Sequence, residues 1–207
     1  MTHRRALLAA PALLLPVLSA RAQDAALARV EAYFNGLTTL RARFLQIAFN
    51  GASAEGTAWI WRPSRMRFEY DPPEPTLLVA ADRQFFHWDK ELKQATVVPL
   101  ESTPLGVLLR TPLRLSGDVT VGGVDRAGGA LRVTVFRTGH QAEGRIQLVL
   151  EENPMELRQW VVVDAQNRPT RVTLNRIEKG LRFDPFLFAF NDPRFREELE
   201  RGGRGAP

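Results

Sequence analysis

Residues Trp59-Ile60-Trp61-Arg62-Pro63, followed by Met66-Arg67-Phe68-Glu69-Tyr70, are the stretch of sequence that says most about the fold. In the second run, apolar residues alternate with charged ones, which is the period of a strand with one buried face. In the first run, three consecutive apolar residues indicate a strand with two apolar faces. Together they predict neighbouring strands of an antiparallel sheet.

The same period of two recurs along most of the chain. Leu131, Val133 and Val135, for example, alternate with Arg132 and Thr134. About a dozen short strands separated by turn signals predict a mostly β protein built on a large curved antiparallel sheet or an open barrel. Besides the two strands above, we expect strands at residues 40–49, 76–81, 84–89, 95–100, 119–124, 131–135, 146–150, 157–164, 172–174 and 186–191.

Two helices are expected beside the sheet. Leu27, Val30, Phe34 and Leu37 recur at helical spacing. This pattern predicts an amphipathic helix with Asp24 as its N-cap and a stop at Asn35-Gly36. Its apolar stripe has to lie on other apolar residues.

The second helix is short and sits between Thr103 and Pro112. Thr103 is expected to cap it and Pro104 to occupy its first position. Because Leu105, Val107, Leu108 and Leu109 make it apolar all round, it needs cover on every side. We expect it to lie across the mouth of the sheet, beside the first helix.

Residues 1–22 have the features of a cleavable secretory signal peptide. Arg4 and Arg5 precede an apolar run from Ala6 to Leu18, and Ala20-Arg21-Ala22 offers a small-x-small cleavage site. A membrane anchor is the alternative, but the run is shorter than the roughly 20 residues that a spanning helix needs. We therefore expect a soluble periplasmic protein, with one domain at residues 23–195 and a flexible charged tail at 196–207.

Composition argues against several classes of function. The chain has 28 Lys and Arg against 23 Asp and Glu, and three of the arginines lie in the predicted signal peptide. The remaining charges are interleaved, so we expect no nucleic-acid partner. With no cysteine, and with only His87 and His140 after residue 22, we expect no catalytic residue, no metal site and no cofactor. Neither a Gly-x-Ser-x-Gly motif nor a phosphate-binding glycine loop is present.

The aromatic residues and Arg62 each allow two interpretations. Large apolar side chains usually form an ordinary core, but an apolar helix above a curved sheet also fits a cavity. Arg62 at a strand end is either solvated or donates hydrogen bonds to carbonyl groups at a cavity rim. The sequence pattern alone leaves both questions open.

The order of several short motifs resembles the periplasmic outer-membrane lipoprotein carrier family (LolA). Residues 59–63 and 66–70 carry most of the resemblance. It continues through Pro72-Pro73, Thr76-Leu77-Leu78-Val79, Trp88-Asp89, Thr103-Pro104 and Phe183-Asp184-Pro185. The chain departs from the family pattern at Met66, where many members have an aromatic residue, and at Arg83, where many have glycine.

The resemblance implies an incomplete β-barrel whose short-helix lid covers an apolar cavity. It makes Arg62 the latch of the lid and implies that helix residues Leu27, Val30 and Phe34 pack the lid. Acyl chains are expected to bind at the following residues: Trp59, Trp61, Met66, Phe68, Tyr70, Leu105, Val107, Leu108 and Leu109.

The implied function is a non-enzymatic, monomeric periplasmic chaperone for lipoproteins. It would take their acyl chains from an ATP-driven exporter in the inner membrane and deliver them to an acceptor in the outer membrane. Three alternatives remain at this point: a carrier of free lipid, a signalling or acceptor module on the same fold, and a hydrolase.

Overall fold

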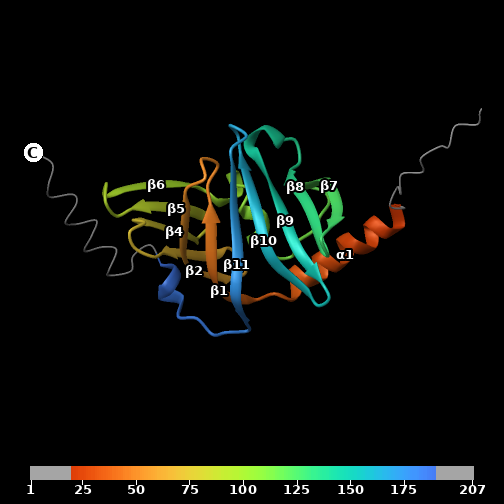
Figure 1. The fold of residues 1–207 in the computed structure, drawn as a ribbon, viewed down its shortest axis with the longest axis horizontal. Coiled ribbons are helices and arrows are strands. Elements are labelled where there is room, and N and C mark those ends of the chain that lie inside the picture. Colours follow the sequence, from red (N-terminus) through yellow and green to blue (C-terminus); the bar gives the residue numbers. More distant parts are fainter. Residues whose placement is uncertain (1–19, 190–207) are drawn as a thin grey trace, which may run out of the picture.

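One open antiparallel sheet makes up most of the molecule in the computed structural model, which describes residues 20–189. Its eleven strands have the order β6-β5-β4-β3-β2-β1-β11-β10-β9-β8-β7 (Figure 1). The strands are β1 Thr39–Ile47, β2 Ser53–Trp61, β3 Arg65–Tyr70, β4 Thr76–Ala81, β5 Gln84–Asp89, β6 Gln94–Pro99, β7 Val119–Ala127, β8 Ala130–Arg137, β9 Gly144–Glu152, β10 Met155–Asp164 and β11 Pro169–Lys179.

The sheet curls strongly but does not close. In Figure 1, β4, β5 and β6 run across the direction of β1 and β11, and β6 and β7 are the two free edges. This architecture confirms the predicted incomplete, mostly β barrel.

Alternating apolar residues put one face of the sheet into a single core. On β8, for example, Leu131, Val133 and Val135 are buried, and their neighbours on β9 include Leu148 and Leu150. A second cluster of Leu77, Val79, Phe86 and Trp88 is buried on the opposite, convex face of β4 and β5. The sheet therefore has apolar residues on both faces in its β4–β5 half.

The helix α1 (Ala20–Gly36) runs beside the ends of β9 and β10 (Figure 1). Val30 and Phe34 are buried, and Leu27 packs against the core, as the helical spacing predicted. The helix ends at Gly36 as expected, but Asp24 lies inside it, so the prediction that Asp24 is its N-cap is wrong. The hydroxyl of Tyr33 accepts a hydrogen bond from the Leu157 N–H at 3.1 Å and ties the helix to β10.

The short helix α2 (Gly106–Leu109) follows the 3-10 turn η1 (Leu100–Ser102), and all four of its residues are buried. It begins later than predicted, because the Thr103 hydroxyl donates to the Leu100 carbonyl at 2.8 Å and caps no helix. We call residues 100–110 the lid, since they connect the β6 side of the open barrel to the other side.

The chain after β11 packs on the convex face. Pro185–Phe188 form a 3-10 turn, η3, so the strand expected at residues 186–191 is wrong over 186–188, and residues 190 and 191 lie outside the described part. A second 3-10 turn, η2 (Gln141–Glu143), joins β8 to β9. Most of the predicted signal peptide and the whole predicted tail at 196–207 also lie outside the described residues, so these boundaries stay predictions.

Candidate functional site

An apolar cavity of about 200 Å³ lies between the concave face of the sheet and the lid. Met66, Phe68 and Tyr70 of β3 point into it, because alternate residues of one strand share a face. Opposite them, Trp160 and Val172 come from β10 and β11, and Leu105 comes from the lid. At its rim, the Tyr70 hydroxyl donates to Gln46 Oε1 at 2.7 Å, and burial raises the pKa of Tyr70.

Gly56 on β2 positions the aromatic residues of this wall. A Cβ at Gly56 would lie 2.2 Å from the Glu69 carbonyl oxygen and 2.7 Å from the Phe44 ring. Only glycine therefore lets Phe44 lie against Phe68 and Tyr70, with ring centroids 4.9 and 5.0 Å away. The close approach fixes the wall before any ligand binds.

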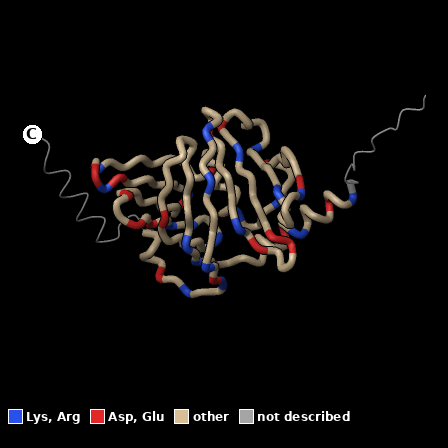
Figure 2. Tube along the Cα trace, viewed as in Figure 1, with Lys and Arg blue, Asp and Glu red and all other residues tan. Residues whose placement is uncertain are grey.

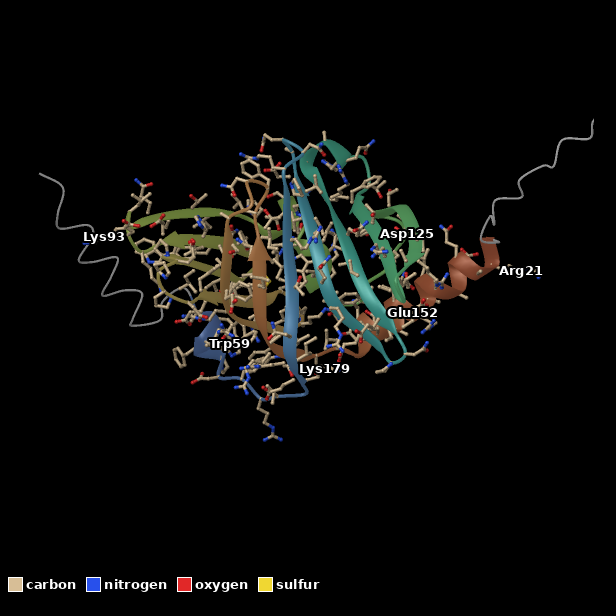
Figure 3. All side chains as sticks on the ribbon, in the orientation of Figure 1. Arg21, Trp59, Lys93, Asp125, Glu152 and Lys179 are labelled. Carbon is tan, nitrogen blue, oxygen red and sulfur yellow. The ribbon has the colours of Figure 1, made fainter. Side chains whose placement is uncertain are left out.

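Trp59 and Trp61 do not face this cavity, so their assignment to its lining is wrong. Ala58 and Ile60 of the same strand are in the core, which puts the two tryptophans on the convex face. There the Trp61 ring meets Phe188 at 5.9 Å and Arg65 at 4.5 Å. Figure 3 shows Trp59 on the side of the sheet where the C-terminal segment runs.

Among the lid residues, Leu105 and the α2 residues have different surroundings. Leu105 is half-buried and lines the cavity, whereas Val107, Leu108 and Leu109 are almost fully buried in the core. The α2 residues therefore anchor the lid in this structure, and their contact with acyl chains stays a prediction.

Arg62 lies between β2 and β3 and is only 5% exposed. Its Nη1 donates to the Leu37 carbonyl at 3.3 Å, one residue beyond α1, and its Nη2 donates to the Arg110 carbonyl, just beyond α2. The guanidinium carbon also lies 5.5 Å from the centroid of the Phe34 ring. Arg62 thus joins the end of α1 to the end of the lid.

The environment of this guanidinium is unusual for a cation. No carboxylate of the described residues pairs with it, and its buried Nε has no hydrogen-bond partner there. Burial lowers the pKa of Arg62 to about 10, because the charged form loses hydration. Two backbone carbonyls, those of Leu37 and Arg110, provide its hydrogen-bond partners.

Two polar side chains of α1, those of Asn35 and Glu31, also hold the chain after the lid, a role that the sequence pattern did not predict. The Asn35 side chain donates to the Leu113 carbonyl at 3.0 Å and accepts from the Leu113 N–H at 2.7 Å. Glu31 accepts from the Leu115 N–H at 2.6 Å. These contacts join segments about 80 residues apart, which no local pattern reveals. Trp160 and Leu78 of the cavity wall were also missed, although their strands were predicted.

Neither a metal site nor a membrane span is found in the described part. Residues 20–189 contain no group of three or more His, Asp or Glu side chains placed to hold an ion. Within the same range, no helix is long and apolar enough to cross a bilayer.

Comparison with known proteins places the chain among carriers. A family model described as outer membrane lipoprotein carrier protein LolA matches residues 35–191. An outer-membrane lipoprotein carrier protein of Alkalilimnicola ehrlichii is 29% identical, over 91% of this chain and 89% of its own length. One of Pseudomonas fluorescens is 32% identical, over 53% of this chain and 54% of its own. A LolA superfamily protein of Nitrosomonas europaea aligns with a TM-score of 0.46 at 6% identity, covering 80% of this chain and 96% of that one.

Proposed function

The chain belongs to the LolA family of outer-membrane lipoprotein carrier proteins, and from this membership we propose that it carries the acyl chains of lipoproteins from the inner to the outer membrane. The observation that supports this most is the apolar cavity beneath a lid that Arg62 holds closed. Its relatives are named for this cargo, which favours lipoprotein over the free-lipid alternative.

A carrier of this kind solves a solvation problem. Each buried methylene is worth about 0.8 kcal/mol, so exposing the acyl chains of one lipoprotein to water costs on the order of tens of kcal/mol. The carrier has to hide the chains and still release them. A closed, empty state that is stable in its own right competes with the loaded state and makes release possible.

The lid has to move for loading. A cavity of roughly 150 Å³ accommodates a ligand the size of benzene, and this one measures about 200 Å³, far too little for several acyl chains. We propose that cargo enters as residues 100–110 swing away from Phe68 and Trp160. The two Arg62 hydrogen bonds break in this step and form again on release.

The cellular setting follows as part of the same proposal. The chain acts in the periplasm after removal of residues 1–22, with an ATP-driven exporter as donor and an outer-membrane protein as acceptor. It works as a non-enzymatic monomer and binds no cofactor or nucleic acid. The fold by itself also suits a carrier of free lipid or a signalling module.

The experiment that separates these functions is the identification of what the protein binds in its own periplasm. The protein is purified without detergent, and its ligands are analysed by mass spectrometry. Peptides that carry an acylated N-terminal cysteine are the expected result. Phospholipid alone would favour the free-lipid carrier, and protein with neither ligand would contradict a carrier role.

A further inference from the structure

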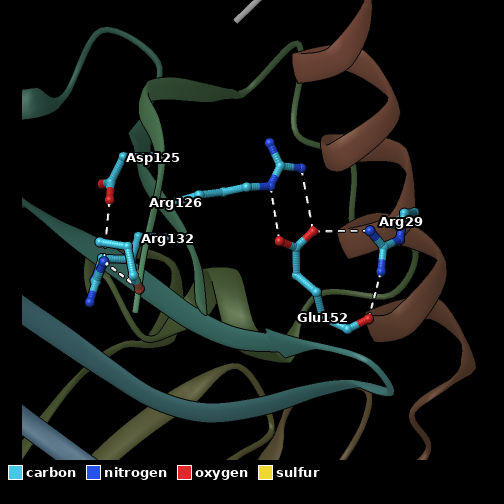
Figure 4. A network of polar contacts seen from close by, with 6 residues as sticks. Arg29, Asp125, Arg126, Arg132 and Glu152 are labelled. Carbon is cyan, nitrogen blue, oxygen red and sulfur yellow. Dashed lines mark hydrogen bonds and ion pairs between the residues drawn. The ribbon is translucent and has the colours of Figure 1, made fainter. Parts of the chain in front are cut away.

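The two free edges of the sheet are built differently. The β7 edge has a bulge between Val121 and Gly123 and carries charged residues at Asp125 and Arg126. Asp125 pairs with Arg132, and Arg126 pairs with Glu152, which also binds Arg29 (Figure 4). Bulges and charges are the usual devices that keep an edge strand from accepting another strand.

The β6 edge has no bulge and no charge, and the residue that blunts it is Pro99 at its end, which offers no N–H. Residues Gln94–Pro99 contain no charge, and their pairing with β5 is regular along its whole length. Figure 2 shows this strand uncoloured between the charged β5–β6 turn and the lid. Val97 is 53% exposed, and no strand of residues 20–189 pairs with the outer side of β6.

The backbone groups that this edge offers follow from its register. Leu100 donates its N–H to the Arg83 carbonyl at 2.8 Å. Because bonded and non-bonded pairs alternate in an antiparallel ladder, Val98, Thr96 and Gln94 turn their backbone groups toward β5. Ala95 and Val97 therefore direct their N–H and C=O groups to the free edge.

The location of β6 connects this edge to the cavity. Thr96 lies opposite His87, which lies opposite Leu78 of the cavity wall, so the inner face of β6 continues that wall. The lid begins at Leu100, directly after β6, and the carbonyl of its second residue, Glu101, accepts a 3.0 Å hydrogen bond from Arg137 of β8. The β6 edge therefore lies beside the cavity wall and the start of the lid, and it lacks the bulge and the ion pairs of the β7 edge.

We propose that the free edge of β6 binds, as an added strand, the extended polypeptide that follows the lipid-bearing residue of the cargo. This inference rests on the proposed lipoprotein function. Backbone hydrogen bonds would supply most of the attraction, so recognition tolerates many sequences, as a carrier of different lipoproteins requires. The segment suited to this uncharged edge is itself uncharged and rich in β-branched or small residues.

Synthetic lipopeptides test the proposal. The parent ligand is an acylated cysteine followed by six residues of Ser, Thr and Val. In two derivatives, every second backbone amide is N-methylated. One derivative carries the methyl groups on the odd-numbered amides, and the other carries them on the even-numbered amides, which are the two possible phases. Only one phase faces β6, so one derivative is expected to bind about tenfold more weakly than the parent and the other about equally, since two lost backbone hydrogen bonds have this effect.

Variants of β6 provide the matched controls. Val97→Pro removes the N–H that faces the free edge, a place where a sheet tolerates proline, and should abolish the difference between the two derivatives. Val97→Thr keeps the N–H and the branched shape and should preserve the difference. The unfolding temperature of both variants shows whether the fold is intact.

The outcomes separate this inference from the function on which it rests. Equal affinity for both derivatives and the parent would overturn strand addition and leave the acyl-binding function standing. Failure of all lipopeptides, and of the acylated cysteine alone, would overturn both. Concentration-dependent dimerisation that Val97→Pro abolishes would assign the edge to a second copy of the chain and overturn the cargo assignment.

Discussion

At the scale of single residues, Arg62 is the side chain whose energetics depend most on the state of the lid. A buried charge is costly unless hydrogen bonds compensate for its lost hydration. Here the compensation comes from the carbonyls of Leu37 and Arg110, at the ends of α1 and of the lid. Any movement of the lid therefore changes the free energy of Arg62 directly.

Replacing Arg62 with leucine should slow the release of cargo without preventing its uptake. Each charge-assisted hydrogen bond contributes about 1.5–3 kcal/mol, and in the proposed mechanism these bonds stabilise only the closed, empty state. Their loss should increase retention at least about tenfold, since 1.4 kcal/mol corresponds to a factor of ten. Loading from donor membranes and delivery to acceptor membranes, measured separately, check this result.

Two further substitutions make the Arg62 experiment specific. Arg62→Lys should rescue delivery only in part, because an ammonium lacks the planar fork of the guanidinium. Arg65→Leu removes a nearby arginine that stacks on Trp61 at 4.5 Å, on the convex face, and should release normally. Normal delivery by Arg62→Leu would remove the latch from the mechanism.

Leu105 provides a test of the cavity itself. Leu105→Glu would place a carboxylate at the apolar wall, where its desolvation is costly, so binding of an environment-sensitive apolar dye should weaken at least about tenfold. Leu92→Glu, on a leucine that is 65% exposed, is the matched control and should bind the dye normally. Unchanged binding by Leu105→Glu would show that the dye occupies another site.

At the scale of elements, η3 closes the convex face of the sheet. Phe188 is almost fully buried and lies 5.9 Å from Trp61 and 6.0 Å from Phe183, while Arg67 donates to the Leu187 carbonyl at 3.3 Å. Phe188→Ala should lower the free energy of unfolding by about 3–5 kcal/mol, as buried phenylalanines do. Phe186→Ala, two residues earlier but 64% exposed, should change it by less than about 0.5 kcal/mol. Urea unfolding of both variants is the measurement, and equal losses would contradict this packing.

The contact between α1 and the β9–β10 turn should depend on pH. Hydrogen bonds from Arg126 at 2.9 Å and Arg29 at 3.0 Å hold the pKa of Glu152 below its usual 4.5. A carboxylate with a lowered folded-state pKa contributes stability above the unfolded value and loses it as the pH falls through the folded one. The stability difference between the wild type and Glu152→Gln should therefore be present at pH 7 and be lost progressively as the pH falls below 4.5.

Thermal unfolding of the wild type and Glu152→Gln across this pH range measures the difference. Glu178→Gln is the control, because the ion pair of Glu178 with Arg41 is about half exposed. A Glu152→Gln difference that is independent of pH would mean that the ion pairs do not anchor α1.

The sequence pattern predicted where the strands lie, but it did not predict which residues of each strand face the cavity. Apolar runs bounded by turn signals located β4 and β5 at the correct residues, but both strands carry apolar side chains on both faces. The Trp59-Ile60-Trp61 run shows no alternation, so it could not tell which residues face the cavity. On the convex face, Trp61 packs against Phe188 of η3, where the pattern had suggested a strand.

Arg62 and Arg83 also show, at single positions, what the sequence could predict and what only the structure shows. The sequence placed Arg62 at a strand end but could not choose between water and the carbonyls, since its partners lie 25 and 48 residues away. Arg83 stands where many family members have glycine, and its φ of 62° lies in the left-handed region that favours glycine. Arg83 is not among the residues that line the cavity.

At the scale of the whole molecule, the structure is that of a closed carrier. The curled sheet supplies three sides of an apolar cavity, and the lid, fixed by Arg62 and the α2 leucines, supplies the fourth. Because the barrel has free edges at β6 and β7, it can widen without breaking a strand pair. Under the proposed function, the same scaffold holds a small cavity when empty and a larger one when loaded.

The most direct test of acyl-chain carriage is site-specific photo-crosslinking in cells. A photoreactive amino acid is placed at Met66, inside the cavity, or at Trp59, on the convex face of the neighbouring strand. The proposed function predicts adducts of acylated cysteine peptides at Met66 and few or none at Trp59. Equal labelling at both positions, or only phospholipid adducts at Met66, would contradict a lipoprotein carrier that holds acyl chains beneath its lid.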